Sequence, residues 1–296
     1  MGYYFYNKTR VREVRRTNYF RGAGGEIREF FMLRDFTKEK FDVIILAGQS
    51  NAEGYGFGDV ESPYEPTPDV WCMNDDFSIK KLYTIAPAVE MVTKNEVQSH
   101  LGLTFAAEYL KAGRLTEGRK LLILRAASGG SGFANNRWHL TDDLYIRMID
   151  MIDTALELNP ENRLVALLWH QGETDALAEA GFDLHYGNLS TLLSSVREKY
   201  GCENLPFIAG DFVHHWSRTG VKTPEKCAPV LQAIRAVCRD MGPAKFVETD
   251  GLFSNKEAYD ALKWNPGGWE DSIHFSRRGV YELGRRYFKA FSEIEN

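Results

Sequence analysis

The chain has 296 residues, of which 36 are basic and 41 acidic, so its formal net charge is −5. Hydrophobic residues make up 44% and charged residues 26%, which is typical of folded globular proteins and excludes wholesale disorder. The mildly acidic balance argues against nucleic acid as a partner, since its binding depends on basic side chains that neutralise phosphates. Aromatic residues reach 13%, a high value for a chain of ordinary hydrophobicity.

Membrane and metal signals are weak in this sequence. No stretch approaches the roughly eighteen uninterrupted apolar residues of a membrane-spanning helix, so we expect no membrane partner. The first residues lack the apolar core and cleavage site of a signal peptide, which predicts a cytoplasmic location; a periplasmic or secreted location is the alternative if a signal segment has been removed. The cysteines lie far apart, at positions 72, 202, 227 and 238, and form no metal-binding spacing, which favours free thiols.

Apolar runs and helical patterns alternate from residue 41 onward. Strands are predicted at 41–47, 120–126, 164–169, 206–210 and 245–248. Helices are predicted near 103–112, 142–158, 183–200 and 228–240, with a last one from about Ser276. Strands interleaved with helices favour an α/β fold with a parallel sheet covered on both faces.

No linker or internal repeat interrupts this alternation, so we predict one domain over residues 41–296. Residues 1–40 begin with a basic stretch, and we expect them to form an extension packed on the domain. The span 52–100 is the least regular part of the chain, and in such a fold an insertion of this kind tends to lie near the active-site edge.

The first strand runs into Gly48-Gln49-Ser50-Asn51. A serine at a strand-to-helix turn is well placed as a nucleophile, and its own backbone N–H at the helix start can bind an oxyanion. Position 52 is Ala, so the G-x-S-x-G nucleophile elbow is absent. The competing interpretation is a Ser/Asn helix cap, which is common.

The C-terminal region supplies Asp271 and, three residues later, His274. An aspartate at this spacing can accept a hydrogen bond from the imidazole Nδ1–H, which leaves Nε2 free to take a proton from a serine. Taken alone, the pair also fits an N-cap region with an incidental histidine before the last helix.

Polar residues follow two further strands. After 164–169, Gln171 can present an amide donor, and Glu173 can orient a neighbour or serve as an alternative acid. Metal ligation by His170 and Glu173 is the competing interpretation, but no H-E-x-x-H motif is present. After 120–126, Gly129 and Gly130 can expose backbone N–H groups to an oxyanion; neither G-x-G-x-x-G nor a Walker motif is present to indicate phosphate binding.

Taken in order, these segments resemble a known family. The chain carries Gly48-Gln49-Ser50-Asn51, then Gly129-Gly130-Ser131, then Trp169-His170-Gln171-Gly172-Glu173, then Asp271-x-x-His274. Over roughly residues 41–290 this series is similar to the SGNH hydrolases. Within them it resembles the carbohydrate-esterase branch that contains sialate O-acetylesterases and acetylxylan esterases (family six).

The resemblance implies a flavodoxin-like three-layer α/β/α sandwich with a parallel sheet of about five strands. It implies Ser50 as nucleophile, His274 as base and Asp271 as the orienting acid. The implied oxyanion donors are the backbone of Ser50, a glycine at 129 or 130, and the side chain of Gln171, which stands where general SGNH members have an asparagine.

The implied activity is a serine esterase that removes O-acetyl groups from a carbohydrate, with O-acetylated sialic acid closest and no metal or organic cofactor. The alternatives are an acetylxylan esterase, a lipase- or thioesterase-like SGNH hydrolase, and a non-catalytic carbohydrate-binding module on the same scaffold. The sequence does not predict an oligomeric state.

Substrate-binding candidates lie close to these motifs in the sequence. Gln49 and Asn51 flank the serine. Trp138, Trp264 and Trp269 lie in predicted loops, where their flat faces could stack on a sugar ring, whereas Trp169 ends a buried strand and is expected to pack in the core.

Overall fold

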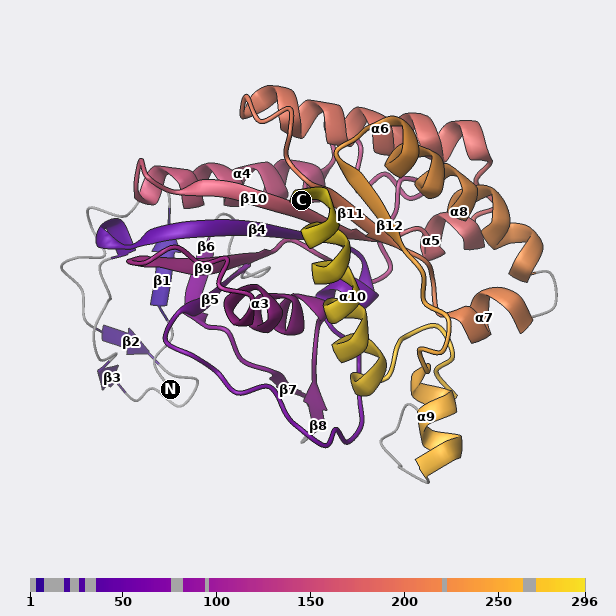
Figure 1. Cartoon of the computed structure of the whole chain (residues 1–296), viewed down its shortest axis with the longest axis horizontal. Helices are drawn as coiled ribbons and strands as arrows, with labels where there is room; N and C mark the ends of the chain where they lie inside the picture. The colour runs from indigo at the N-terminus through magenta and orange to yellow at the C-terminus, as the bar shows by residue number, and fades with distance from the viewer. Residues whose placement is uncertain are drawn as a thin grey trace.

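A computed structural model describes residues 4–7, 19–21, 27–29, 36–75, 82–93, 96–219, 223–262 and 270–295. A twisted central sheet dominates this part of the chain (Figure 1). Its strands are β1 (Tyr4–Asn7), β4 (Lys40–Gly48), β5 (Val70–Asp75), β6 (Leu82–Pro87), β9 (Arg119–Arg125), β10 (Arg163–His170), β11 (Phe207–Gly210) and β12 (Ala244–Val247).

The described strands of this sheet follow the order β1-β6-β5-β9-β4-β10-β11-β12. Neighbouring strands from β5 to β12 run parallel. At the other edge β6 is antiparallel to β5, and β1 is antiparallel to β6. Two small antiparallel ladders lie outside the sheet: β2 (Tyr19–Arg21) with β3 (Ile27–Glu29), and β7 (Met91–Thr93) with β8 (Glu96–Gln98).

Helices cover both faces of the sheet (Figure 1). One face carries α3 (Leu101–Lys111) and α10 (Arg277–Glu295). The other carries α4 (Asp143–Leu158), α6 (Phe182–Lys199) and α8 (Thr223–Asp240). Short helices lie at the connections: η1 (Phe36–Lys38), α2 (Ser50–Glu53), α5 (Glu173–Leu177), α7 (His214–Thr219) and α9 (Asn255–Leu262).

The predicted three-layer α/β/α fold is confirmed, and each predicted strand and long helix is present. The sheet is mostly parallel, and it is wider than the predicted five or so strands because β5, β6 and β1 join it. The sequence missed β5 and β6, which lie inside the irregular span 52–100 and extend the sheet. Their signal is weak because prolines precede β5 and its apolar run, Val70–Met73, is very short. The antiparallel β1 comes from the segment that we expected to be an extension.

The middle of the sheet is buried on both faces. In β4, Val43 and Ile45 pack into the core beneath α4 and α6, while Ile44 and Leu46 pack into the core beneath α3 and α10. A strand buried on both faces has a continuous apolar sequence, which is why β4 could be predicted from the sequence alone. Among the described residues, no helix has the length and apolar content needed to cross a membrane.

The carboxyl end of β4 lies unusually close to β10. Gly48 has φ +134°, and a Cβ added there would lie 2.1 Å from the backbone oxygen of His170. Only glycine combines this backbone conformation with the absence of a side chain. Because parallel strands end at the same edge of a sheet, the loops after β4, β9 and β10 converge at this point.

Candidate active site

Ser50 lies at the carboxyl end of β4, as the first residue of α2. The residue before it is anchored across the sheet, because the backbone N–H of Gln49 donates to the oxygen of His170 at 3.0 Å. As the first helical residue, Ser50 has a backbone N–H without an acceptor inside its own helix. The serine therefore offers both a hydroxyl and an N–H donor at the same edge of the sheet.

The three predicted triad residues form a continuous chain of hydrogen bonds. His274 Nε2 lies 2.7 Å from Ser50 Oγ, and His274 Nδ1 lies 2.7 Å from Asp271 Oδ2. Asp271 therefore orients the imidazole so that Nε2 faces the hydroxyl. This is the arrangement by which a base removes the proton of an attacking serine.

Asp271 is held as a carboxylate by its surroundings. Burial by itself raises its pKa, but the hydrogen bonds and charge of His274 and the amide of Asn255 outweigh burial and hold the pKa below its ordinary value. Asn255 Nδ2 donates to Asp271 Oδ2 at 3.0 Å and to the oxygen of Tyr55 at 2.9 Å. Sequence reasoning missed Asn255, since it precedes the triad motif by sixteen residues with no recognisable pattern.

Among the described residues, the ring nitrogens of His274 bond Asp271 and Ser50, and Glu173 bonds a different side chain. Its Oε1 accepts a hydrogen bond from Asn51 Nδ2 at 2.7 Å, and Asn51 also bonds the oxygen of Ile273 and the N–H of Phe275. Asn51 thus bonds the backbone on both sides of His274. Glu173 in turn fixes the side chain of Asn51 by accepting its hydrogen bond. Asp271 therefore makes the contact that orients the His274 ring. The buried side chains of Glu173 and Asn51 instead support the backbone around His274.

The environment of Glu173 favours its protonated form. Burial raises its pKa to about 7, against the opposing hydrogen bond from Asn51. Tyr287 donates its single hydroxyl proton to the oxygen of Trp169, so it accepts from His170 Nδ1 at 2.8 Å. The lone pair of His170 Nε2 therefore faces Glu173 Oε1, 3.9 Å away. Burial lowers the pKa of His170 to about 3, which keeps that imidazole neutral.

This pair does not extend into a metal site in the part of the chain that the structure describes. Within those residues, no group of three or more His, Cys, Asp or Glu side chains is arranged to hold an ion. His170 and Glu173 are instead engaged with Tyr287 and Asn51.

A pocket of about 580 Å³ opens in front of Ser50 and His274. Gly129 and Gly130 form part of its wall, but the predicted oxyanion role does not match the contact of Gly129, whose N–H donates to Glu53 Oε2 at 2.6 Å. Tyr55 stacks its ring on that of His274, with centroids 4.8 Å apart. Glu53 and Tyr55 were missed from the sequence, because nothing in their local pattern shows that α2 turns them back toward the serine.

The predicted oxyanion role of Gln171 does not match its geometry. Its Nε2 donates to Asp175 Oδ2 at 2.9 Å and to the oxygen of Ser131 at 3.3 Å, inside the protein. Its side chain is almost fully buried and is not part of the pocket wall. Asp175 holds the amide in place, because the same carboxylate also accepts the N–H groups of Phe133 and Ala134.

The prediction that Trp138 stacks on a sugar is wrong. Its side chain is 0% exposed, its Nε1 donates to Ser131 Oγ, and its ring meets that of Trp169 edge-on at 5.1 Å. The loop that carries Trp138 folds inward, so the indole fills the core. Trp169 is also fully buried, as expected. Trp264 and Trp269 lie outside the described residues.

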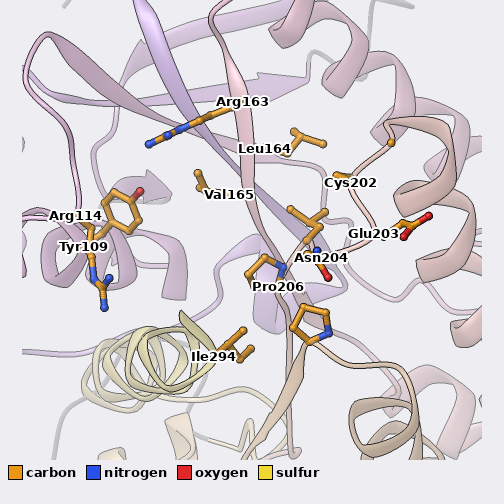
Figure 2. Close-up of a pocket in the computed structure, with 13 residues that line it drawn as sticks. Tyr109, Arg114, Arg163, Leu164, Val165, Cys202, Glu203, Asn204, Pro206 and Ile294 are labelled. Carbon is orange, nitrogen blue, oxygen red and sulfur yellow. The ribbon is translucent and has the colours of Figure 1, made fainter. Parts of the chain in front are cut away.

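A larger hollow, of about 860 Å³, lies at the opposite edge of the sheet (Figure 2). It is formed around the start of β10 and the segment 201–206, and Arg163 and Tyr109 border it. Both side chains bond the buried Asp42, which ties together the amino ends of the strands. Since Ser50 and His274 lie at the other edge, this hollow is separate from the triad.

A Ser-His-Asp chain at the carboxyl edge of an α/β/α sandwich is the arrangement found in serine hydrolases. Comparison with known families makes the class more specific. The family described as "carbohydrate esterase, sialic acid-specific acetylesterase" matches residues 40–293, so the chain belongs to this family. The resemblance drawn from the sequence motifs is thereby confirmed, and the family implies an acetylated carbohydrate as the class of substrate.

Solved structures share the fold. The crystal structure of NanS aligns with a TM-score of 0.70 at 18% identity, covering 87% of this chain and 98% of that one. A protein from Arabidopsis thaliana aligns with a TM-score of 0.62 at 18% identity, over 85% and 98% of the two chains. A carbohydrate acetylesterase from Xanthomonas citri aligns with a TM-score of 0.54 at 16% identity, over 86% and 56%. No curated protein sequence matches the chain.

Replacing Asp271 and replacing Glu173 should lower the activity by different amounts. Asp271→Asn should lower kcat by roughly a thousandfold or more, because the amide lacks the negative charge that stabilises the imidazolium of His274 and has only one oxygen where the carboxylate uses two, on the His274 N–H and on Nδ1. Glu173→Gln keeps the oxygen that accepts from Asn51, so kcat should fall by less than about tenfold. Steady-state kinetics on an activated acetate ester decides the ranking, and the reverse order would make Glu173 the acid.

Glu173 also predicts a pH dependence of stability. With a folded pKa of about 7 against an ordinary 4.5, the folded state binds more protons than the unfolded state between these values. The free energy of unfolding should therefore fall as pH rises through this window, by ~1.4 kcal/mol for each unit of pKa difference. Urea unfolding of the wild type and Glu173→Gln at several pH values tests this: parallel curves would show that Glu173 carries no such effect.

Proposed function

We propose that the protein is a serine esterase that removes O-acetyl groups from a carbohydrate, with Ser50 as nucleophile and His274 as base. The observation that carries this proposal is the hydrogen-bonded chain from Ser50 Oγ through His274 to Asp271, at 2.7 Å for each step. Ser50 and His274 lie at the wall of a pocket that is large enough for an acetyl group and part of a sugar.

In the proposed reaction, His274 Nε2 takes the proton of Ser50 as Oγ attacks the acetyl carbon. The carbonyl electrons move to the oxygen, and the tetrahedral intermediate then collapses and expels the sugar oxygen, which takes the proton from His274. Water, activated by the same histidine, releases acetate from Ser50. Asp271 stays ionised and stabilises the imidazolium that forms in each half of the cycle.

The family description favours O-acetylated sialic acid as the substrate, and the charge of the pocket limits how such a molecule would bind. Of the described residues that line the pocket, none is Lys or Arg, and Glu53 contributes a carboxyl group. An anionic substrate would meet repulsion there if its own carboxylate entered the pocket. We infer that the scissile ester lies far from the sialate carboxylate, which stays outside.

A neutral acetylated sugar, such as an acetylated xylan fragment, is the second candidate. The same observation favours it, because a neutral ring meets no repulsion from Glu53. Acetate release from both classes of substrate, measured side by side, separates the two.

Replacing the nucleophile tests the reaction itself. Ser50→Ala should abolish turnover of an activated acetate ester, since no other hydroxyl bonds His274 Nε2 among the described residues. The thermal midpoint should change little, because the substitution removes a single oxygen at the wall of the pocket. Retained turnover would refute the proposal.

In the wild type, rates that rise with acyl chain length would point to a lipase-like substrate instead of an acetylated sugar.

From the negative charge of Glu53 we predict a preference for neutral over anionic acetylated sugars. Glu53→Gln keeps an oxygen that can accept the N–H of Gly129 but removes the negative charge. The ratio of kcat/KM for an acetylated sialate to that for a neutral acetylated sugar should rise about two- to fivefold at low salt, and less at high salt. An unchanged ratio at low salt would contradict any repulsion between Glu53 and the sialate carboxylate, including repulsion that acts from outside the pocket.

A further inference from the structure

The ring of Tyr55 lies flat against the imidazole of His274, the proposed base. The ring centroids are 4.8 Å apart, and the two planes deviate from parallel by 22°. Both ring nitrogens of His274 are engaged in the plane of the imidazole, Nε2 with Ser50 and Nδ1 with Asp271. Tyr55 therefore contacts a face of the imidazole and competes with neither of these hydrogen bonds.

The backbone of Tyr55 is tied to a residue that also holds the acid. Asn255 Nδ2 donates to the oxygen of Tyr55 at 2.9 Å and to Asp271 Oδ2 at 3.0 Å. The N–H of Asn255 donates to the oxygen of His274 at 2.9 Å, and its Oδ1 accepts the N–H of Phe57 at 3.1 Å. One buried asparagine thus fixes Tyr55, Asp271 and His274 relative to one another.

The segment after Tyr55 is packed tightly on the start of α10. The oxygen of Phe57 accepts the N–H of Arg277 at 2.7 Å. A Cβ added at Gly56 would lie 2.7 Å from Cγ2 of Val280, so a larger residue does not fit there. Because these contacts leave the backbone little room to move, the ring of Tyr55 keeps a defined position.

Tyr55 also forms part of the pocket wall and is 36% exposed, so it interacts with its neighbours in a partly solvated place. Its hydroxyl is 3.6 Å from the point that a Cβ on Gly129 would occupy, so the ring spans from His274 to the loop after β9. Burial, and to a smaller degree the charge of Glu53, raise the pKa of Tyr55. The phenol therefore stays neutral while His274 takes up and releases its proton.

The charge of His274 changes during the proposed reaction. The imidazole is neutral when it accepts the proton of Ser50, and it is a cation until that proton passes to the sugar oxygen. A cation within about 6 Å of an aromatic centroid is attracted by the negative face of the ring. The stacked tyrosine therefore interacts more strongly with the transition state, in which the imidazolium forms, than with the resting enzyme.

We propose that Tyr55 is a positioning residue whose ring stabilises the imidazolium of His274 and keeps that imidazole aimed at Ser50. This inference rests on the proposed acyl transfer at Ser50. As Ser50 Oγ bonds the acetyl carbon, its proton moves to His274 Nε2, and the same proton then leaves with the sugar oxygen. In the second half of the cycle, water supplies the proton that His274 returns to Ser50. Tyr55 exchanges no proton and acts through His274.

Other charged groups belong to the elements around His274. They are Asp271 on the same loop, Glu53 on α2, Glu173 on α5 and Lys256 on α9. The ammonium of Lys256 is paired with Asp260. Burial raises the pKa of Glu173 to about 7, even though the hydrogen bond from Asn51 opposes it. Its titration therefore overlaps the pH range in which an esterase is assayed, so pH profiles are to be measured on protein that carries Glu173→Gln.

Tyr55→Leu and Tyr55→Phe, made in this Glu173→Gln parent, test the role of the ring. Tyr55→Leu should lower kcat/KM for an activated acetate ester about three- to tenfold, because it removes the aromatic face. The acid limb of its kcat/KM profile should move to lower pH by about half a unit, since a less stabilised imidazolium releases its proton more readily. Tyr55→Phe keeps the ring and should restore kcat/KM to within about threefold of the parent, with the acid limb back in place.

Fluorination at the same position changes the charge distribution of the ring and keeps its shape. Fluorine withdraws electron density from the π face, so Tyr55→pentafluorophenylalanine should lose at least as much kcat/KM as Tyr55→Leu. Tyr55→trifluorophenylalanine should lie between it and Tyr55→Phe. Because these variants retain the packing of Tyr55→Phe, they report on the π face even if Tyr55→Leu lowers the thermal midpoint.

Leu177 supplies the matched control, as an exposed apolar side chain in the same pocket wall. Leu177→Ala removes apolar surface from the pocket but no π face. It should alter KM and leave the acid limb of the profile where the parent has it.

Two results would overturn the role of Tyr55. One is an acid limb that stays in place in both Tyr55→Leu and Tyr55→pentafluorophenylalanine. The other is a Tyr55→Phe variant as impaired as Tyr55→Leu, because the effect would then belong to the hydroxyl. Either result leaves the proposed function standing if Ser50→Ala is inactive, whereas turnover by Ser50→Ala would refute that function itself.

Discussion

The close approach of β4 and β10 at their carboxyl ends is the constraint on which the site depends. Gly48 lets the two backbones meet where any side chain would collide with His170, and the N–H of Gln49 then bonds the oxygen of His170. This contact fixes the direction in which the chain leaves β4. It delivers Ser50 to the start of α2, with Gln49 turned toward the loop that follows β10.

A buried polar network transmits this geometry to the C-terminal segment. Asn51 joins Glu173, on α5, to the backbone around His274, which lies more than two hundred residues later in the chain. Burying a carboxyl group is costly, and the raised pKa of Glu173 reflects that cost. Protonation of Glu173 reduces this cost, and its Oε1 still accepts the hydrogen bond from Asn51. His274 is thus positioned by side chains, those of Asn51 and Glu173, that do not line the pocket.

Much of the fold was readable because the central strands are buried on both faces. Continuous apolar runs identified β4, β9 and β10, and the amphipathic spacing of α4 identified the layer above them. The strands β5 and β6 were not predicted, since their short apolar runs lie close to prolines and β5 pairs with β9, which is distant in sequence. Their place in the sheet depends on pairing with β9 and with each other, which no local pattern reveals.

By itself, the sequence determined the residue types and the order of Ser50, Asp271 and His274, because strand ends and a three-residue spacing are local properties. Tertiary structure alone decided which way the neighbouring side chains point. Gln49 and Gln171 are the same residue type, but backbone N–H groups from another loop hold the first toward the pocket, and Asp175 holds the second away from it. Trp138, placed in a loop by its sequence, fills the core because that loop folds inward. The direction of a side chain depends on partners that are remote in the chain, and only folding brings those partners together.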